Sequence, residues 1–132
     1  MISMKEYLGN ASLTDIPVSH VHNMETLLKK VNLLREAWNK PMTVTSGYRT
    51  LQEHLRIYSE KKVPQDKIPM SSAHLSGEAI DIYDPGLLIT KWLKENDSSR
   101  LQALDLYCEE GNSNWLHVST RKPKSGARWF RP

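Results

Sequence analysis

Cysteine is almost absent from the sequence: Cys108 is the only one, so no internal disulfide bond can form. Cysteine content therefore gives no sign of an oxidising compartment, and stability must come from packing and from any bound metal. Long apolar runs are missing as well, because no stretch approaches the roughly 18 apolar residues of a membrane span. The N-terminal residues MISMKEYLGNASLTDIP also lack the apolar segment of a secretory signal peptide. We therefore expect no membrane insertion.

The composition has no extreme feature. Hydrophobic residues make up 39% and charged residues 25% of the 132 residues, which excludes a disordered chain and predicts a single domain over residues 1–132. The 18 lysines and arginines exceed the 15 acidic residues, for a formal net charge of +3. This charge mildly favours anionic partners such as nucleic acid, wall polymer or membrane headgroups, without choosing among them.

The basic excess is concentrated near the C-terminus, and two interpretations of that segment are open. It is either a docking tail or, as we favour, a solvated C-terminal strand and loop whose aromatic residues Trp129 and Phe130 cover the edge of the core. The basic residues of the segment are Arg121, Lys122, Lys124, Arg128 and Arg131.

The first half of the chain predicts two helices and one strand. Apolar residues recur at three- and four-residue steps from His22 to Asn39, which is typical of an amphipathic helix. Alternation over residues 42–45 predicts a short strand that runs into a Ser46-Gly47 turn. A second helix is expected over residues 51–60. Residues 61–73 contain two prolines and no periodicity, so we expect a long surface loop of a length that is often functional.

The second half predicts mainly strands. Residues 79–83 are compatible with a short strand, and Asp84-Pro85 supplies the start of a helix through about Glu95. Residues 104–110 and 115–120 predict two strands of a β-hairpin, joined by the turn-rich sequence GNSN. The order of these elements predicts an α+β domain with helices packed on a small, mainly antiparallel sheet.

Two histidines and an aspartate have the pattern of a zinc site. In SAHLSGEAID, His74 precedes Asp81 by seven positions, and a loop followed by a strand can aim both side chains at one point. His117 lies in the alternating sequence WLHVS, on the same strand face as Trp115 and Ser119. Imidazole nitrogen and carboxylate oxygen suit Zn²⁺, and three protein ligands leave the fourth position that a catalytic zinc site needs.

The expected hairpin also selects a candidate base. With a turn over residues 111–114, or over the tighter 112–113, Glu110 lies opposite Trp115 and Cys108 lies opposite His117. Glu110 is then expected to face the metal and to act as a general acid and base in amide hydrolysis, while Glu109 faces away. Arg49 follows the Ser46-Gly47 turn, where it is placed to bind a substrate carboxylate or an oxyanion.

Three separate motifs then resemble one family. TSGYRT at residues 45–50, S-x-H-x-x-G-x-A-x-D at 72–81 and W-x-H-x-S at 115–119 closely resemble the zinc D-alanyl-D-alanine carboxypeptidase and L-alanyl-D-glutamate endopeptidase family, especially its small phage-encoded members. The resemblance runs in order over about residues 14–120. It implies the hedgehog/D-Ala-D-Ala peptidase fold and a peptidase that cuts the peptide part of bacterial peptidoglycan.

The resemblance also implies roles for individual residues. One zinc ion is expected on His74, Asp81 and His117, with Arg49 on the substrate carboxylate. Several members place the catalytic glutamate three residues before the last histidine, where this chain has Asn114. Other small members carry a glutamate at the end of the preceding strand, which is the Glu110 position. Substrate contacts are expected from Arg49, Tyr48, Ser72 and Trp115, and Ser72 and Ser119 are candidates for orienting the ligands.

Other functions stay open beside this one. A zinc-stabilised wall-binding or virion module without a working base is the main alternative, and nucleic-acid binding through the basic C-terminal segment is a third that has only charge in its favour. Arg49 favours catalysis, because a purely structural metal site has no use for it. We expect a monomer without nucleic-acid partners, made in the cytoplasm and acting on the wall after holin-type release or from a virion.

The remaining reactive side chains are expected to be structural. His20 and His22 precede a helix without a third ligand nearby, so we expect surface histidines there. His54 is expected at a polar surface or a cleft rim. Cys108 is either a small buried hydrophobe, which we favour, or a thiol that faces the zinc.

Overall fold

The computed structural model describes all 132 residues and has the expected α+β architecture. It has five helices and five strands, with 3₁₀ turns at Leu13–Asp15, Gln65–Lys67 and Pro85–Leu87. The helices are α1 (Met4–Leu8), α2 (Val18–Trp38), α3 (Leu51–Glu60), α4 (Leu88–Glu95) and α5 (Arg100–Leu104). The strands are β1 (Val44–Ser46), β2 (Ala79–Tyr83), β3 (Tyr107–Glu109), β4 (Trp115–Ser119) and β5 (Trp129–Phe130).

The five strands form one sheet in the order β1-β2-β4-β3-β5. All neighbouring strands are antiparallel except β3 and β5, which are parallel. Strand β5 is the C-terminal strand expected from the basic segment, and its residue Trp129 packs against the core as predicted. The sheet is therefore mainly antiparallel, and β2 and β4 lie at its centre.

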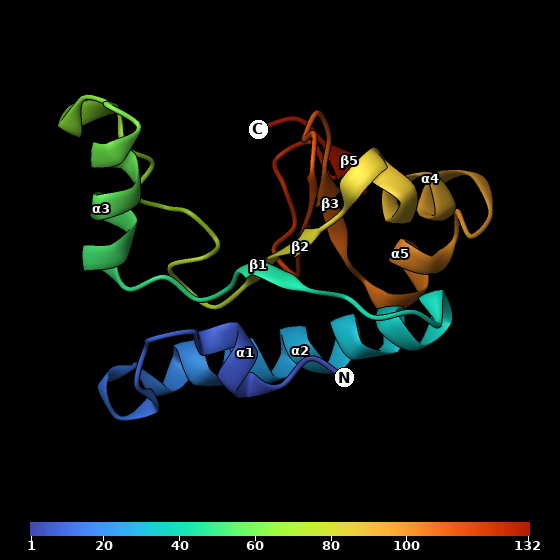
Figure 1. Cartoon of the computed structure of the whole chain (residues 1–132), viewed down its shortest axis with the longest axis horizontal. Helices are drawn as coiled ribbons and strands as arrows, with labels where there is room; N and C mark the ends of the chain where they lie inside the picture. Colours follow the sequence, from blue (N-terminus) through green and yellow to red (C-terminus); the bar gives the residue numbers. More distant parts are fainter.

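The two faces of the sheet differ in chemistry. Ile80 and Ile82 on β2, Leu116 and Val118 on β4, and Cys108 on β3 are buried on one face, in the same apolar cluster as residues of α2, α4 and α5. Residues of opposite parity point to the other face, because successive side chains on a strand alternate. Figure 1 shows α2 along the bottom of the molecule, α4 and α5 beside the strands at the right, and α3 standing apart at the upper left.

The N-terminal segment supports the sheet from beside β1. Tyr7 is almost completely buried, and its hydroxyl donates a hydrogen bond to the Ala79 carbonyl at 2.8 Å. The Tyr48 backbone N–H donates to the Tyr7 carbonyl at 3.0 Å. Gly47 lies against this segment so closely that a Cβ there would be 1.9 Å from the Tyr7 oxygen. Only glycine fits at this contact, which fixes the path of the chain as it leaves β1.

Several predicted elements are confirmed and others differ. Helix α3 and strand β2 have the predicted bounds, whereas α2 begins at Val18 rather than His22. The helix expected from Asp84-Pro85 begins later, because Gly86 and Leu87 have positive φ angles of 67° and 56°, which interrupt the helix after Pro85. The buried Asp84 carboxylate instead accepts from the Ile89 N–H at 2.8 Å, which caps α4. No helix is long and apolar enough to cross a membrane.

Candidate metal centre

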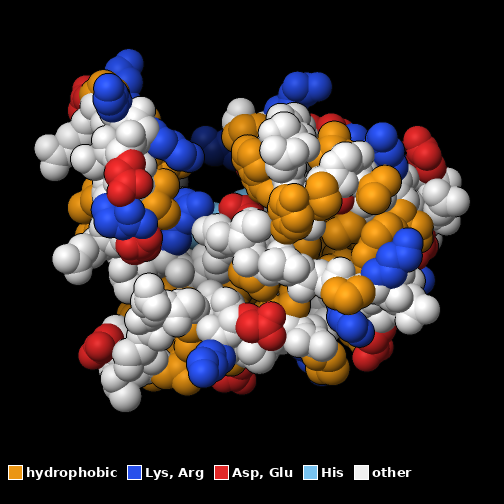
Figure 2. All heavy atoms as spheres, viewed as in Figure 1, with side chains coloured by type: hydrophobic (Ala, Val, Ile, Leu, Met, Phe, Trp, Pro, Cys, Tyr) orange, Lys and Arg blue, Asp and Glu red, His pale blue; other side chains and the backbone are white.

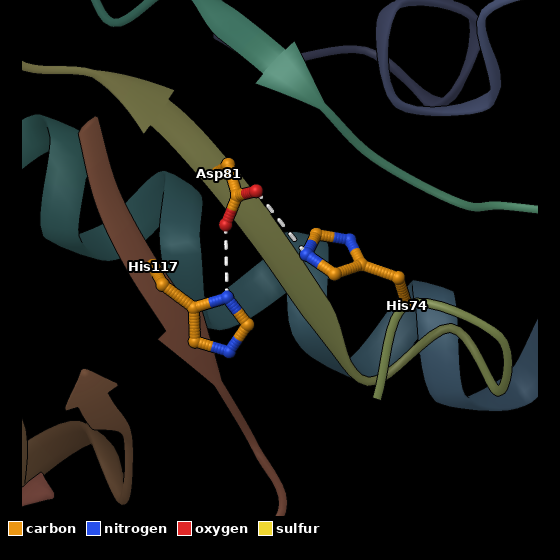
Figure 3. A group of neighbouring side chains, drawn as sticks. All are labelled: His74, Asp81 and His117. Atoms are coloured by element: carbon orange, nitrogen blue, oxygen red, sulfur yellow. Dashed lines mark hydrogen bonds and ion pairs between the residues drawn. The ribbon is translucent and has the colours of Figure 1, made fainter. Parts of the chain in front are cut away.

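Three side chains from separate parts of the sequence meet on the sheet face that is turned away from the core (Figure 3). Asp81 on β2 and His117 on β4 are directly opposite each other across the two central strands. His74 comes from the loop before β2 and reaches the same point. One ligand atom from each residue lies within 4.8 Å of the others. The structure thus brings together the three residues that the sequence predicts as metal ligands.

His74 is held in one orientation by the backbone. Its Nδ1 donates to the Gly47 carbonyl at 2.8 Å, because a carbonyl can only accept. The other ring nitrogen, Nε2, lies 3.3 Å from Asp81 Oδ2 and is the one left to bind a metal. The Arg49 backbone N–H in turn donates to the His74 carbonyl at 3.1 Å. Such an outer hydrogen bond fixes the tautomer that a metal-binding histidine needs.

Asp81 supplies negative charge at the centre of the group. Burial by itself raises the pKa of this carboxyl, but hydrogen bonds from His117 and then His74 outweigh it and hold the pKa well below its usual range. His117 Nδ1 lies 2.8 Å from Asp81 Oδ1. An ionised carboxylate between two imidazole nitrogens is a donor set that suits Zn²⁺, with room for a fourth ligand. The residues present therefore fit one zinc ion.

The predicted register of the β3–β4 hairpin is wrong by one residue. Cys108 pairs with Val118 rather than His117, and it is buried in the core. The shift moves each side chain of β3 to the other face. Glu110 therefore points away from the metal centre, and both of its carboxylate oxygens accept from Lys94 Nζ, at 3.0 and 2.9 Å. The sequence-based assignment of Glu110 as the base is overturned by this placement.

Glu109 lies on the face that was expected for Glu110. It follows Cys108 in a regular strand and pairs with Phe130 of β5, so it continues the row formed by Asp81 and His117. The Phe130 ring stands edge-on to the His117 ring, with centroids 6.1 Å apart. Glu109 is thus the glutamate that the sheet places beside the metal centre.

Asn112 connects Glu109 to Trp115. With its amide oriented so that both ends find partners, its nitrogen donates to Glu109 Oε1 at 3.2 Å. Its oxygen accepts from the Trp115 indole N–H at 3.3 Å. These bonds hold the Glu109 side chain from the loop side of the hairpin.

Arg49 lies at the edge of the metal centre. Its Nη2 is 3.9 Å from Asp81 Oδ2, its Nε donates to Ser46 Oγ at 3.2 Å, and its side chain is 14% exposed. Residues 46–49 also line a cavity of about 540 Å³ between α1, β1 and α3. Figure 2 shows the surface hollowed between α3 and the part of the molecule that holds β3 and β5, with Lys and Arg side chains on the α3 side. Arg49 is therefore near both the metal centre and open space.

Three other predicted residues have identifiable contacts. The Tyr48 hydroxyl is 3.0 Å from His20 Nδ1, which links the chain after β1 to the start of α2. Ser72 Oγ accepts from the His74 N–H at 3.3 Å and so shapes the ligand loop. His54 is fully buried, which corrects its expected place at the surface or cleft rim. Its Nε2 donates to the Pro69 carbonyl at 2.7 Å and ties α3 to the loop before His74.

Arg121 is a residue of this region that sequence reasoning did not identify. It follows β4 and donates to Ser76 Oγ at 2.9 Å and to Glu78 Oε1 at 2.9 Å from Nη2, and to the Ser71 carbonyl from Nη1. It therefore connects the strand that carries His117 to both ends of the loop that carries His74. Its place among the C-terminal basic residues concealed this role, because spacing in sequence does not show which cation folds back.

Comparison with known proteins gives one match. A family model described as Peptidase M15 matches residues 9–119, which include all three candidate ligands, Arg49 and Glu109. Searches among curated proteins and among solved structures find no match.

Proposed function

The chain belongs to the Peptidase M15 family of zinc metallopeptidases that act on peptidoglycan, and from this premise we propose that it hydrolyses a peptide bond of the stem peptide. The residues proposed to hold the zinc are His74, Asp81 and His117. The observation that carries the proposal is their convergence beside a carboxylate and an arginine on one face of the sheet. A metal site of purely structural purpose has no need of either neighbour.

Zinc, when bound, supplies a Lewis acid that polarises the scissile carbonyl and lowers the pKa of water. Glu109 is the proposed general base, in place of Glu110. It takes a proton from the attacking water and delivers it to the leaving amine. The bond from Asn112 to Oε1 restrains the Glu109 carboxylate.

Arg49 is proposed to bind the substrate. Its guanidinium is held by Ser46 Oγ, and its distance of 3.9 Å from Asp81 leaves donors free for a second carboxylate or for the developing oxyanion. Tyr48, which follows Gly47 on the same segment, is proposed to contact the same part of the substrate.

Phage origin, release through a holin or action from a virion are also proposed, and they are supported by the sequence resemblance to small phage-encoded members.

The test is digestion of purified peptidoglycan by the zinc-loaded protein, with mass analysis of the fragments. We expect cleavage by the wild type and a loss of at least about 100-fold for Glu109→Gln, because one general base contributes roughly 10²–10⁴ to the rate. Glu110→Gln is the matched control, since it is the next residue on the other face, and it is expected to retain activity. Zinc content is measured for each variant to separate loss of the base from loss of metal.

Each result has a distinct meaning. No release of fragments by the zinc-loaded wild type contradicts the peptidase function and favours the non-catalytic module. Cleavage that survives Glu109→Gln and is lost in Glu110→Gln contradicts the base assignment alone. Salt-sensitive binding to DNA without any wall cleavage favours the nucleic-acid alternative.

A further inference from the structure

Two exposed aromatic side chains lie next to the metal centre on the same sheet face. Tyr83 on β2 and Trp115 on β4 are directly opposite each other, and they have the same parity as Asp81 and His117. Tyr83 is 50% exposed and Trp115 is 39% exposed. Large aromatic side chains left open beside a catalytic site are typical of a binding surface. We call this pair the aromatic shelf.

The aromatic shelf is displaced from the metal centre in a defined direction. It lies two residues further along both central strands, which corresponds to about 7 Å. Strand β1 runs antiparallel to β2, with Ser46 opposite Asp81, so the chain that continues to Arg49 leaves toward the Ala79 end. The metal centre therefore lies between Arg49 on one side and the aromatic shelf on the other.

The chemistry of the shelf selects one part of peptidoglycan. The stem peptide offers small methyl groups and charged side chains, whereas the sugar rings of the glycan strand offer flat C–H faces with polar edges. Aromatic faces pack well against such flat apolar surfaces, and the Trp115 indole N–H is already bonded to Asn112. What the shelf presents to a ligand is therefore mainly ring surface, which favours a sugar over a charged peptide side chain.

We propose that the aromatic shelf binds the amino-sugar ring that carries the stem peptide; this inference rests on the proposed function. The first stem residue, L-alanine, is attached to that ring through a lactyl group. The lactyl group and the alanine together span about two extended residues of about 3.5 Å each. A ring on the shelf, about 7 Å from the metal, therefore places the carbonyl of that alanine at the metal. The bond between L-alanine and D-glutamate is the one that is cleaved.

The products follow from this placement. Water adds to the alanine carbonyl, the C–N bond breaks and the leaving nitrogen takes a proton, which gives a sugar-linked alanine carboxylate and a peptide with a free D-glutamate amine. The free α-carboxylate of D-glutamate lies on the Arg49 side of the metal. The carbonyl of the terminal D-Ala–D-Ala bond lies three residues, or roughly 10 Å, beyond the alanine carbonyl, which is too far for the same ring to reach the shelf.

The test compares two soluble substrates that differ only in the sugar: a disaccharide pentapeptide and the same free pentapeptide. For the wild type we expect cleavage between L-alanine and D-glutamate in both, with kcat/KM about tenfold higher for the disaccharide form. Tyr83→Ala is expected to abolish this preference while it cleaves the free peptide as well as the wild type. Leu33→Ala, which removes a 44% exposed leucine from α2, is the control and should keep the preference.

A binding measurement complements the rates. The N-acetylglucosamine–N-acetylmuramic acid disaccharide, added without peptide, should shift the Trp115 indole N–H resonance in the wild type, and the shift should weaken in Tyr83→Ala. Equal rates for both substrates, or cleavage only at D-Ala–D-Ala, overturn this inference and leave the proposed peptidase function intact. Failure to cleave either substrate overturns the proposed function as well.

Discussion

Asp81 and His117 lie directly opposite each other on the two central strands, and their side chains meet at 2.8 Å between Oδ1 and Nδ1. Because one rung of the sheet supplies both residues, their spacing is set by the register of β2 and β4. The third residue, His74, comes from a loop and depends on contacts outside the sheet. The metal centre therefore combines a rigid pair with a ligand whose position can be tested separately.

Replacement of Asp81 by asparagine should remove the charge and keep the shape. We expect zinc affinity to fall by at least about 100-fold, which is more than the loss caused by changing an outer partner of a ligand. The measurement is competition with a chelator of known affinity. Retention of wild-type affinity would contradict the assignment of Asp81 as a ligand. Asp84→Asn is a poor control because that carboxylate caps α4; Asp105→Asn, at an exposed pair with Arg128, is the better one.

Much of this fold was predictable because the signals are local. Strand β2 is followed directly by Asp84-Pro85, and α3 begins after the N-cap residue Thr50. The bounds of both elements therefore agree with the prediction. The ligands were predictable because their motifs are separate and specific. Helix α1 was missed although Ser3 and Glu6 form a capping box, since five residues are too few to show helical periodicity.

The base was mispredicted because register is not a local property. The pairing of Cys108 with Val118 requires an odd number of residues between paired positions, whereas the predicted turn had an even number. Because residues 109 and 110 are both glutamates, the residue type does not show which of the two faces the metal centre. Glu110 is the one that faces α4, where it pairs with Lys94, 16 residues earlier in the sequence. Contacts of this kind appear only after the chain is folded.

His54 should make the stability of the metal-free protein depend on pH. Burial is the main cause that lowers its pKa below the ordinary 6.5, and positive charge on Arg49 adds to this effect. The unfolded chain then binds more protons than the native one, so this stabilisation is present above about pH 6.5 and is lost as the pH falls toward the folded pKa. His54→Gln keeps a donor for the Pro69 carbonyl but does not titrate.

The test for His54 is the free energy of unfolding in urea, measured between pH 7.5 and pH 5 with a chelator present to keep the protein metal-free. The wild type should lose more stability over this range than His54→Gln does. Equal slopes for the two proteins would show that His54 does not contribute to the acid sensitivity.

Arg121 should control how firmly the loop around His74 is held. Arg121→Ala removes its bonds to Ser76, Glu78 and the Ser71 carbonyl. We expect a 10- to 100-fold loss of zinc affinity, in the range for an outer partner of a ligand, and faster proteolysis within residues 61–78. Arg128→Ala, which removes a basic residue paired with Asp105, is the matched control and should leave both unchanged. Equal effects of the two substitutions would indicate a general charge effect.

Gly47 should be the least replaceable glycine, because it serves the fold and the metal centre at once. In Gly47→Ala the new Cβ meets the Tyr7 carbonyl oxygen at 1.9 Å, so the N-terminal segment must move. We expect a loss of at least about 1–3 kcal/mol in the free energy of unfolding, as for other overpacked sites. The Gly47 carbonyl that holds His74 Nδ1 moves with it, so zinc affinity should fall as well. Gly111→Ala is the control: its φ of 88° gives strain, but its Cβ meets nothing within 4 Å. If the two variants lose equal stability in urea and both keep zinc affinity, the contact between Gly47 and Tyr7 does not position His74.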